Sequence, residues 1–411
     1  MKEYWFYLES YVFIDTNERM TFIYNTISKK SEEFKNNAIL EDLIRELMKD
    51  ENMYCISVND DMLNDSIVRN FVNRIIDTFS GDLVSKDNII KKPLIFFPKV
   101  SLQKGIRFLQ NNDFRSKAMI MKSLTEINFQ LTGKCDSQCK DCDGYYKQTL
   151  FCHKNNNQLN KEEIITFMKQ LNHALITKIS LTGGNIFLYP YLEDIISYLN
   201  ENNFRIELVI NINHIENIIN NMINLSQISY LKILVNSIMD FEKIKLIYND
   251  DLQTKDNLSI EWIILISDED EYDDIVSIIE KNKISNYRIL PFYNTKNIDF
   301  FKNNIFLSKD DILSSIDDKK TIFTKKQINI FDFGKLFISS KGYVYSNYNL
   351  TPIGTISTEV SKLLLKELQG TKSWRRTRYN MKICSECIYK IICPSPSNYE
   401  FIFGRPDLCK L

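Results

Sequence analysis

The chain has 411 residues, of which 44% are hydrophobic and 26% charged, a composition typical of a globular protein with more than one domain. The formal net charge of −1 provides no broad basic surface for nucleic acid, and no apolar run is long enough to cross a bilayer. Most of the nine cysteines fall in two tight groups, which indicates metal binding in a reducing compartment. We therefore expect a cytoplasmic protein that binds neither membrane nor nucleic acid.

Residues 1–115 are expected to form a small N-terminal α+β domain. Strand-like runs cover residues 4–14, 20–24 and 53–58, and apolar residues at helical spacing cover 38–49 and 60–79. The polar stretch DTNER between the first two runs predicts a hairpin. This order of elements fits a winged-helix module or a cap over the following domain, and both interpretations stay open.

Residues 116–305 alternate strand-like and amphipathic runs, which predicts parallel βαβ units. The expected strands are 126–131, 178–181, 205–212, 230–235, 260–267 and 287–291. The expected helices between them are 161–175, 192–203, 215–225, 241–248 and 271–281. Six such units predict an α/β fold with an open (β/α)6 barrel, whose functional groups lie at the C-terminal ends of the strands.

A CxxxCxxC motif, formed by Cys135, Cys139 and Cys142, directly follows the first of these strands. Three thiolates can hold three irons of a [4Fe–4S] cluster and leave one iron open for a substrate or cofactor. A zinc site completed by Cys152 or His153 is an alternative. A disulfide is less expected, because the cysteine usage is that of a reducing compartment.

The triad after a first barrel strand resembles the radical S-adenosylmethionine (SAM) enzymes. In that family SAM binds the open iron, and its reductive cleavage gives a 5′-deoxyadenosyl radical that abstracts hydrogen from the substrate. The resemblance implies that Cys135, Cys139 and Cys142 are catalytic metal ligands, that the cofactors are SAM and a [4Fe–4S] cluster, and that flavodoxin or ferredoxin is the reductant.

The sequence LTGGNIFLYP follows the second expected strand, and its position matches the family motif GGE, which binds the SAM amino group. The resemblance implies that Gly183, Gly184 and Asn185 contact SAM. The glycines permit close backbone approach, and the Asn185 amide carbonyl can still accept a hydrogen bond from an ammonium group.

Further SAM contacts are implied at the ends of later strands. Asn236 and Ser237 follow the fourth strand as polar contacts, and Leu290 lies in the sixth, where the family packs adenine. Lys140 stands within the triad motif where an aromatic residue is usual in the family, so the motif departs from the family pattern there.

The C-terminal residues 306–411 contain an expected hairpin at 335–348, a helix at 358–368, and a second cysteine group. That group is Cys384, Cys387, Cys393 and Cys409. By spacing alone these four cysteines can bind either a [4Fe–4S] cluster or zinc.

The run from GYVYSN through WRRTR to CSECIYKIIC resembles the SPASM extension of radical SAM enzymes that mature peptides. That family usually carries two auxiliary clusters, but Asn347 and Ser397 stand at two ligand positions of the inner one. The resemblance therefore implies one auxiliary [4Fe–4S] cluster, held by Cys384, Cys387, Cys393 and Cys409.

The closing sequence CPSPSNYEFIFGRPDLC resembles the grasp-with-SPASM maturases, which are encoded beside an ATP-grasp peptide ligase. The implied function is modification of a ribosomally synthesised precursor peptide by cross-linking, thioether formation or epimerisation. Such enzymes carry PqqD-like leader-recognition elements, which residues 1–115 resemble in their order. The alternatives are a catalytically silent protein that escorts the leader peptide to an ATP-grasp ligase, and a zinc protein without redox chemistry.

Several other candidates are expected to have no special function. His214 follows the third strand and is expected to be structural, and Cys152 to be a spare surface thiol. Arg375, Arg376 and Arg378 are expected to be surface charges.

Overall fold

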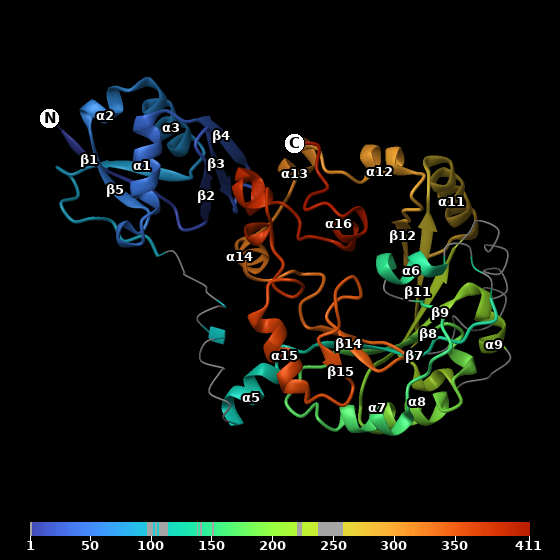
Figure 1. Ribbon diagram of the computed structural model, residues 1–411. Helices are drawn as coiled ribbons and strands as arrows, with labels where there is room; N and C mark the ends of the chain where they lie inside the picture. The colour runs from blue at the N-terminus through green and yellow to red at the C-terminus, as the bar shows by residue number, and fades with distance from the viewer. Residues whose placement is uncertain are drawn as a thin grey trace.

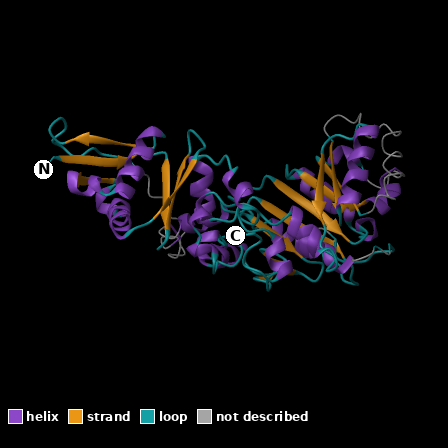
Figure 2. Ribbon diagram, turned by 90° about the horizontal axis from the view of Figure 1, so that it is seen from above, coloured by secondary structure: helices purple, strands orange, loops and turns teal. Residues whose placement is uncertain are grey.

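The computed structural model describes residues 2–96, 102, 105–106, 114–137, 139, 142–149, 152–219, 224–236 and 258–411. The predictions for Lys140, Ser237 and the helix 241–248 lie outside these residues. The molecule is elongated, with the N-terminal elements at one end, the large sheet at the other, and much of the C-terminal part between them (Figures 1 and 2). Within the described part of the chain, no helix combines the length and the apolar character needed to cross a bilayer.

The N-terminal part contains two small antiparallel sheets. In the first, β1 (Glu3–Leu8) lies between β5 (Cys55–Asn59) and β6 (Gly81–Ser85). Helices α1 (Ala38–Met48) and α3 (Ser66–Asp77) bury their apolar faces against it. The second sheet contains β2 (Val12–Thr16), β3 (Met20–Asn25) and β4 (Ser31–Lys35), in that order.

Two predictions for this part need correction. The single strand expected at 4–14 is divided by a turn, and its halves β1 and β2 belong to different sheets, so that only β2 forms the hairpin with β3. The helix expected at 60–79 is interrupted by Asp65 between α2 (Asp60–Asn64) and α3. The Asp65 carboxylate accepts the backbone N–H groups of Ile67 and Val68, which starts a new helix there.

The large sheet confirms the six predicted parallel strands and a mixed α/β fold. The strands are β7 (Glu126–Thr132), β8 (Lys178–Gly183), β9 (Ile206–Asn211), β10 (Tyr230–Val235), β11 (Ser259–Ile266) and β12 (Tyr287–Pro291), and each pairs in parallel with the next. Chain order and spatial order coincide, so the carboxyl ends of all six lie along one edge. Closure into a (β/α)6 barrel stays a prediction.

The helices between these strands begin near the predicted residues. They are α7 (Lys161–Met168), α8 (Leu192–Glu201), α9 (Ile215–Ile219) and α11 (Glu269–Asn282). The helix predicted at 161–175 ends early as α7. Beyond the end of α7, His173 has φ +70°, so a right-handed helix could not continue to residue 175.

The large sheet extends beyond the six expected strands into the C-terminal part. The predicted hairpin at 335–348 is confirmed as β13 (Lys335–Ile338) and β14 (Tyr343–Tyr345), and β15 (Gly354–Thr355) adds to it. Strand β13 pairs in parallel with β7. The large sheet therefore continues across the domain boundary expected near residue 305.

The C-terminal part also packs against the N-terminal part. Phe13 and Phe22 of the second small sheet contact the rings of Phe323 and Tyr389, each pair with centroids 5.3 Å apart. Phe323 lies in α14 (Lys319–Gln327) and Tyr389 in the short helix η10 (Ile388–Ile391). The second cysteine group, which flanks η10, is thus held near the N-terminal sheet.

Candidate metal centres

The cysteine triad, Cys135, Cys139 and Cys142, lies in the loop between β7 and α6 (Cys142–Thr149), at the carboxyl edge of the large sheet. The end of β8 holds this loop, because the Gly184 N–H donates to the Thr132 carbonyl at 2.9 Å and the Asn185 N–H to the Lys134 carbonyl at 2.7 Å. A Cβ atom on Gly184 would lie 2.4 Å from the Lys134 carbonyl oxygen. The close approach predicted at Gly183 and Gly184 is therefore made, in this structure, to the cysteine loop itself.

Helix α6, which begins at Cys142, is fixed to the end of β12. Gln148 donates to the Tyr293 carbonyl and accepts from the Tyr293 N–H, both at 2.8 Å. Cys139 packs against an apolar cluster at the ends of β10, β11 and β12, and the predicted contact Leu290 belongs to the same cluster. Cys139 of the triad and Leu290 therefore lie against the same apolar cluster, and the role of Leu290 as a SAM contact stays a prediction.

Cys152 lies among the triad, which corrects the expectation of a spare surface thiol. A hydrogen bond with Cys142, together with burial and the nearby charges of Cys135 and Cys139, raises the pKa of the Cys152 thiol well above its usual value. Its Sγ lies 4.0 Å from the Gly184 carbonyl oxygen. Four thiols therefore gather at this edge of the sheet.

His214 lies beside the first cysteine of the triad, a contact that its expected position after the third strand did not by itself predict. Its Nε2 is 3.6 Å from Cys135 Sγ and 3.5 Å from Ser137 Oγ, and its Nδ1 is 3.7 Å from a carboxylate oxygen of Asp136. The ring is buried, with 4% of the residue exposed. His214 ends η4 (Ile212–His214), whose start is capped by the Asn211 side chain directly after β9.

Two predicted SAM contacts, Asn185 and Asn236, differ in how many hydrogen bonds their side chains already make. The Asn185 carbonyl accepts the Phe187 N–H at 3.2 Å and its amide donates to Asp136 at 3.2 Å, which leaves one lone pair of the carbonyl. Asn236, after β10, has both side-chain polar atoms buried, and neither has a hydrogen-bond partner among the described residues. A buried amide in this state is suited to a polar ligand.

The second cysteine group, Cys384, Cys387, Cys393 and Cys409, lines one cavity of about 630 Å³ near the C-terminus. The Cys384 thiol is 3.8 Å from a guanidinium nitrogen of Arg378. The donor set is four thiols beside a cation, which fits a four-thiolate [4Fe–4S] cluster, whereas no three of these sulfurs lie within 4.8 Å of one another, as ligation of a single zinc ion would require.

Arg376 and Arg378 are buried, which corrects the expectation of surface charges. Arg378 forms an ion pair with the buried Glu400 at 2.7 Å. Burial alone would lower the pKa of Arg378, but the negative charges of Cys393, Glu400 and Cys384 raise it above its usual value. A permanent positive charge therefore faces the second cysteine group.

At Asn347 and Ser397, where the related family has cysteines, the structure has hydrogen-bonded polar residues. The buried Asn347 amide donates to Asp332 at 3.0 Å and to the Asn398 side chain at 2.8 Å. The Ser397 hydroxyl donates to Glu400 at 2.7 Å, in a capping box that starts α16 (Asn398–Phe403). These polar groups are satisfied without a metal.

One face of the large sheet carries a line of alternating charges, one on each of seven neighbouring strands. In spatial order they are Lys335, Glu126, Lys178, Glu207, Lys232, Glu261 and Arg288, joined by ion pairs of 2.5–3.9 Å. Most of them line a cavity of about 480 Å³ that also reaches Ser397, Asn398 and Tyr399. The sequence carries a signal for this line, a charged residue near the start of each strand.

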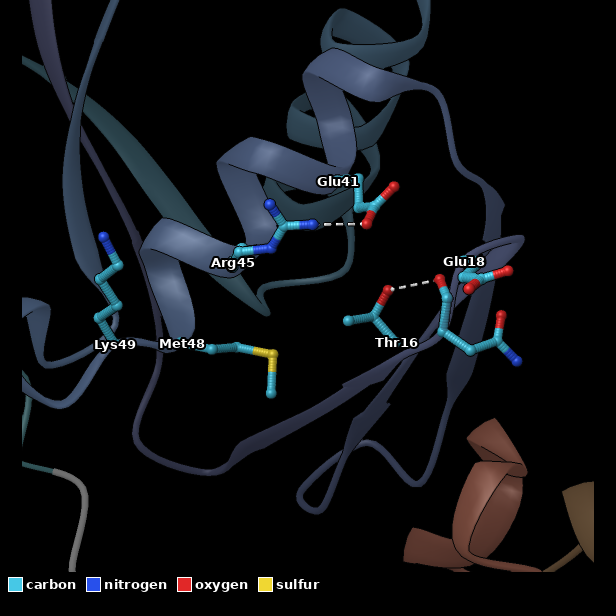
Figure 3. A pocket seen from close by; sticks show the side chains of 7 residues that line it. Thr16, Glu18, Glu41, Arg45, Met48 and Lys49 are labelled. Carbon is cyan, nitrogen blue, oxygen red and sulfur yellow. Dashed lines mark hydrogen bonds and ion pairs between the residues drawn. The ribbon is translucent and has the colours of Figure 1, made fainter. Parts of the chain in front are cut away.

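A further cavity, of about 370 Å³, lies in the N-terminal part between α1 and the turn after β2 (Figure 3). Two of its charged side chains form a local ion pair, with Arg45 2.6 Å from Glu41 (Figure 3). None of the residues that line it is a cysteine or histidine, so it is not a candidate metal centre.

Comparisons with known proteins find only distant structural likeness. No protein-family model matches the chain, and no curated protein matches it. SuiB of Streptococcus suis bound to its precursor peptide SuiA aligns over 99% of this chain and 100% of its own, with 13% identity and a TM-score of 0.48. SuiB bound to S-adenosylmethionine aligns with 13% identity and a TM-score of 0.44, over 99% of each chain. BtrN in complex with AdoMet and 2-DOIA aligns over 65% of this chain and 97% of its own, with 11% identity and a TM-score of 0.31. Likeness this distant does not decide a function, which must be argued from the residues themselves.

Proposed function

We propose that this chain is a radical SAM enzyme that modifies a ribosomally synthesised precursor peptide. The observation that carries the proposal is the contact of the cysteine loop with the Gly183–Asn185 turn at the carboxyl edge of a parallel sheet, with Asn236 at the end of another strand along the same edge. A [4Fe–4S] cluster bound there supplies the electron that cleaves SAM. Hydrogen abstraction from the peptide then leads to a cross-link, a thioether or an epimerised residue.

Each predicted contact has a role that suits its surroundings. Cys135, Cys139 and Cys142 hold the cluster, while Asn185 accepts a hydrogen bond from the SAM ammonium group with its remaining lone pair. Asn236, whose amide lacks a partner among the described residues, binds a polar part of SAM, together with Ser237. Leu290 offers apolar packing for adenine from the cluster of side chains that also contacts Cys139.

The four cysteines that line the C-terminal cavity hold one auxiliary [4Fe–4S] cluster in this proposal. The buried guanidinium of Arg378 offsets part of the negative charge of four thiolates. Asn347 and Ser397 are engaged in hydrogen bonds where a second auxiliary cluster would need cysteines, which favours one such cluster in a SPASM-like domain.

The remaining parts of the proposal concern the polypeptide partners. Residues 116–305 form a partial (β/α)6 barrel, whose inner cavity beside Tyr399 receives the core of the peptide. Residues 1–115 recognise the leader peptide, which binds as an additional strand at the edge of a sheet. Strand β4 offers such an edge, because among the described residues it pairs with β3 alone. A flavodoxin or ferredoxin supplies electrons, and an ATP-grasp ligase is a further partner.

The direct test is formation of 5′-deoxyadenosine from SAM by the anaerobically reconstituted, reduced protein. We expect the product with the intact chain and with Cys55→Ala, a buried thiol of β5 remote in sequence from both groups, and none with a Cys135/Cys139/Cys142→Ala variant. An intact triad cluster that yields no deoxyadenosine, with or without peptide, would contradict the proposal and favour the silent escort protein.

A further inference from the structure

A segment that holds a fourth thiol runs beside the cysteine triad and is firmly fixed there. Residues 152–159 run antiparallel to the end of β7, with backbone hydrogen bonds from the Gly133 N–H to the Asn157 carbonyl at 2.8 Å and from the Asn155 N–H to the Gly133 carbonyl at 2.7 Å. The Gln130 side chain also donates to the His153 carbonyl at 2.6 Å. The position of Cys152 is therefore set by the strand that leads into the triad.

The same segment is also tied to the helix and the loop that carry the triad. The His153 ring stacks on Tyr146 of α6, with centroids 4.1 Å apart and planes 15° apart. The Lys154 ammonium group donates to the Ser137 carbonyl at 2.9 Å. The segment that begins at Cys152 is thus attached both to the loop before Cys139 and to the helix that begins at Cys142.

The Cys152 thiol lies between the triad and the Gly183–Asn185 turn. Its sulfur is 4.0 Å from the Gly184 carbonyl oxygen, and Gly184 in turn lies against Cys135, since a Cβ atom on Gly184 would be 2.9 Å from the Cys135 Cβ. In the proposed function this turn receives the amino group of SAM. The thiol therefore lies on the side of the triad from which SAM would reach the open iron.

We propose, on the basis of the proposed function, that Cys152 ligates the fourth iron of the triad cluster when SAM is absent and that SAM displaces it. The Cys152 thiol loses its proton when its sulfur–iron bond forms. The thiolate regains a proton when SAM takes the position and that bond breaks. No electron is transferred in either step, so the exchange needs no oxidant or reductant. The chain would thereby protect its cluster until SAM arrives.

The first test is mild ferricyanide oxidation of the anaerobically reconstituted full chain, followed by EPR. A cluster held by three thiolates loses its open iron and gives the [3Fe–4S] signal, whereas a cluster held by four resists. We expect little of this signal from the unaltered chain and from the control Cys55→Ala, and a strong signal from Cys152→Ala and Cys152→Ser. Equal signals from the unaltered chain and both Cys152 variants would overturn the inference.

Affinity for SAM gives a second readout that does not depend on catalysis. If Cys152 occupies the iron in about nine of ten molecules, Cys152→Ala should bind SAM roughly tenfold more tightly, because only the SAM-competent fraction binds. Unchanged or weaker binding would contradict the exchange.

A third readout needs no variant. Alkylation of the reconstituted chain followed by peptide mass analysis should modify Cys152 faster with SAM present than without it. Equal rates would count against the inference even if the variants assembled poorly. Absence of any cluster on the triad would instead remove the proposed function, so the two failures are distinguishable.

Discussion

The thiol sulfur of Cys135 lies 3.6 Å from Nε2 of His214, the last residue of the short helix η4 that follows β9. The imidazole is buried, and its other nitrogen faces Asp136 at 3.7 Å. Hydrogen bonds to the sulfurs of an iron–sulfur cluster shift its reduction potential. His214 is therefore placed to change the reduction potential of a cluster bound to Cys135.

We predict that His214→Ala lowers the reduction potential of the triad cluster. When Nε2 carries the proton, the ring donates to the sulfur and stabilises the more negative, reduced state of the cluster, and alanine removes this donor. His214→Gln, which retains a donor, should lie closer to the unaltered chain. The measurement is a potentiometric titration followed by EPR, and an unchanged potential in His214→Ala would show that the ring does not act on the cluster.

We predict that Cys393→Ala abolishes the auxiliary cluster and leaves the triad cluster intact. Total iron should fall from about eight to about four atoms per chain, because each [4Fe–4S] cluster needs its thiolate ligands. The EPR change on addition of SAM should persist in this variant. Full iron content in Cys393→Ala would show that this cysteine is not a ligand, whereas Cys55→Ala should retain all the iron.

We predict that Arg378→Met and Glu400→Gln each lower the free energy of unfolding by about 3–5 kcal/mol, because each leaves a buried charge without its partner. The pair is buried on both sides and 2.7 Å long. Arg378→Lys keeps the charge but loses the planar fork, so it should fall between these variants and the unaltered chain. Urea unfolding monitored by circular dichroism provides the measurement, and a change below the experimental error would contradict the prediction.

The line of charges on the large sheet gives a pH-dependent prediction through Glu207. Burial alone would raise the pKa of this carboxyl, but Lys232, Lys178 and the Ser180 hydroxyl lower it below its ordinary value of 4.5. The nearest contacts are Lys232 at 2.9 Å and Ser180 at 2.7 Å. A depressed folded-state pKa contributes stability that is present above the unfolded-state value and is lost as the pH falls through the folded-state value.

We therefore predict that Glu207→Gln destabilises the fold by about 1–3 kcal/mol at neutral pH, because it removes the carboxylate that pairs with Lys178 and Lys232 and leaves the buried Lys232 with Glu261 alone, at 3.3 Å. The difference from the unaltered chain should narrow as the pH falls below 4.5, where protonation removes the same charge. Metal-free protein should be used for this urea series, so that acid loss of iron does not contribute. A difference that stays constant with pH would show that the charge of Glu207 is not the cause.

The sequence predicts the large sheet well because its strands are nearly continuous apolar runs between turn residues, the pattern of buried parallel strands. It predicts the N-terminal part less well, because similar strand-like residues on both sides of Glu9 and Ser10 do not reveal that β1 and β2 enter different sheets. The interruption at Asp65 was likewise hidden within a continuous helical pattern.

The two cysteine groups can be recognised in the sequence because their members are close together along the chain, apart from Cys409, and their role as cluster ligands stays a prediction. The environments of Cys152, His214 and Arg378 could not be predicted, since each depends on a contact between distant segments. Burial of Arg378, for example, requires Glu400 as its partner 22 residues later. The residues around the WRRTR sequence do not indicate that Arg378 pairs with Glu400.

The central claim, that the chain binds one SAM-type and one auxiliary cluster, is tested most directly by its iron and acid-labile sulfide content. We expect about eight irons in the anaerobically reconstituted chain and about four in a Cys135/Cys139/Cys142→Ala variant, with loss of the EPR signal that responds to SAM. Zinc in place of iron, or an iron content unchanged by the triple substitution, would contradict the account.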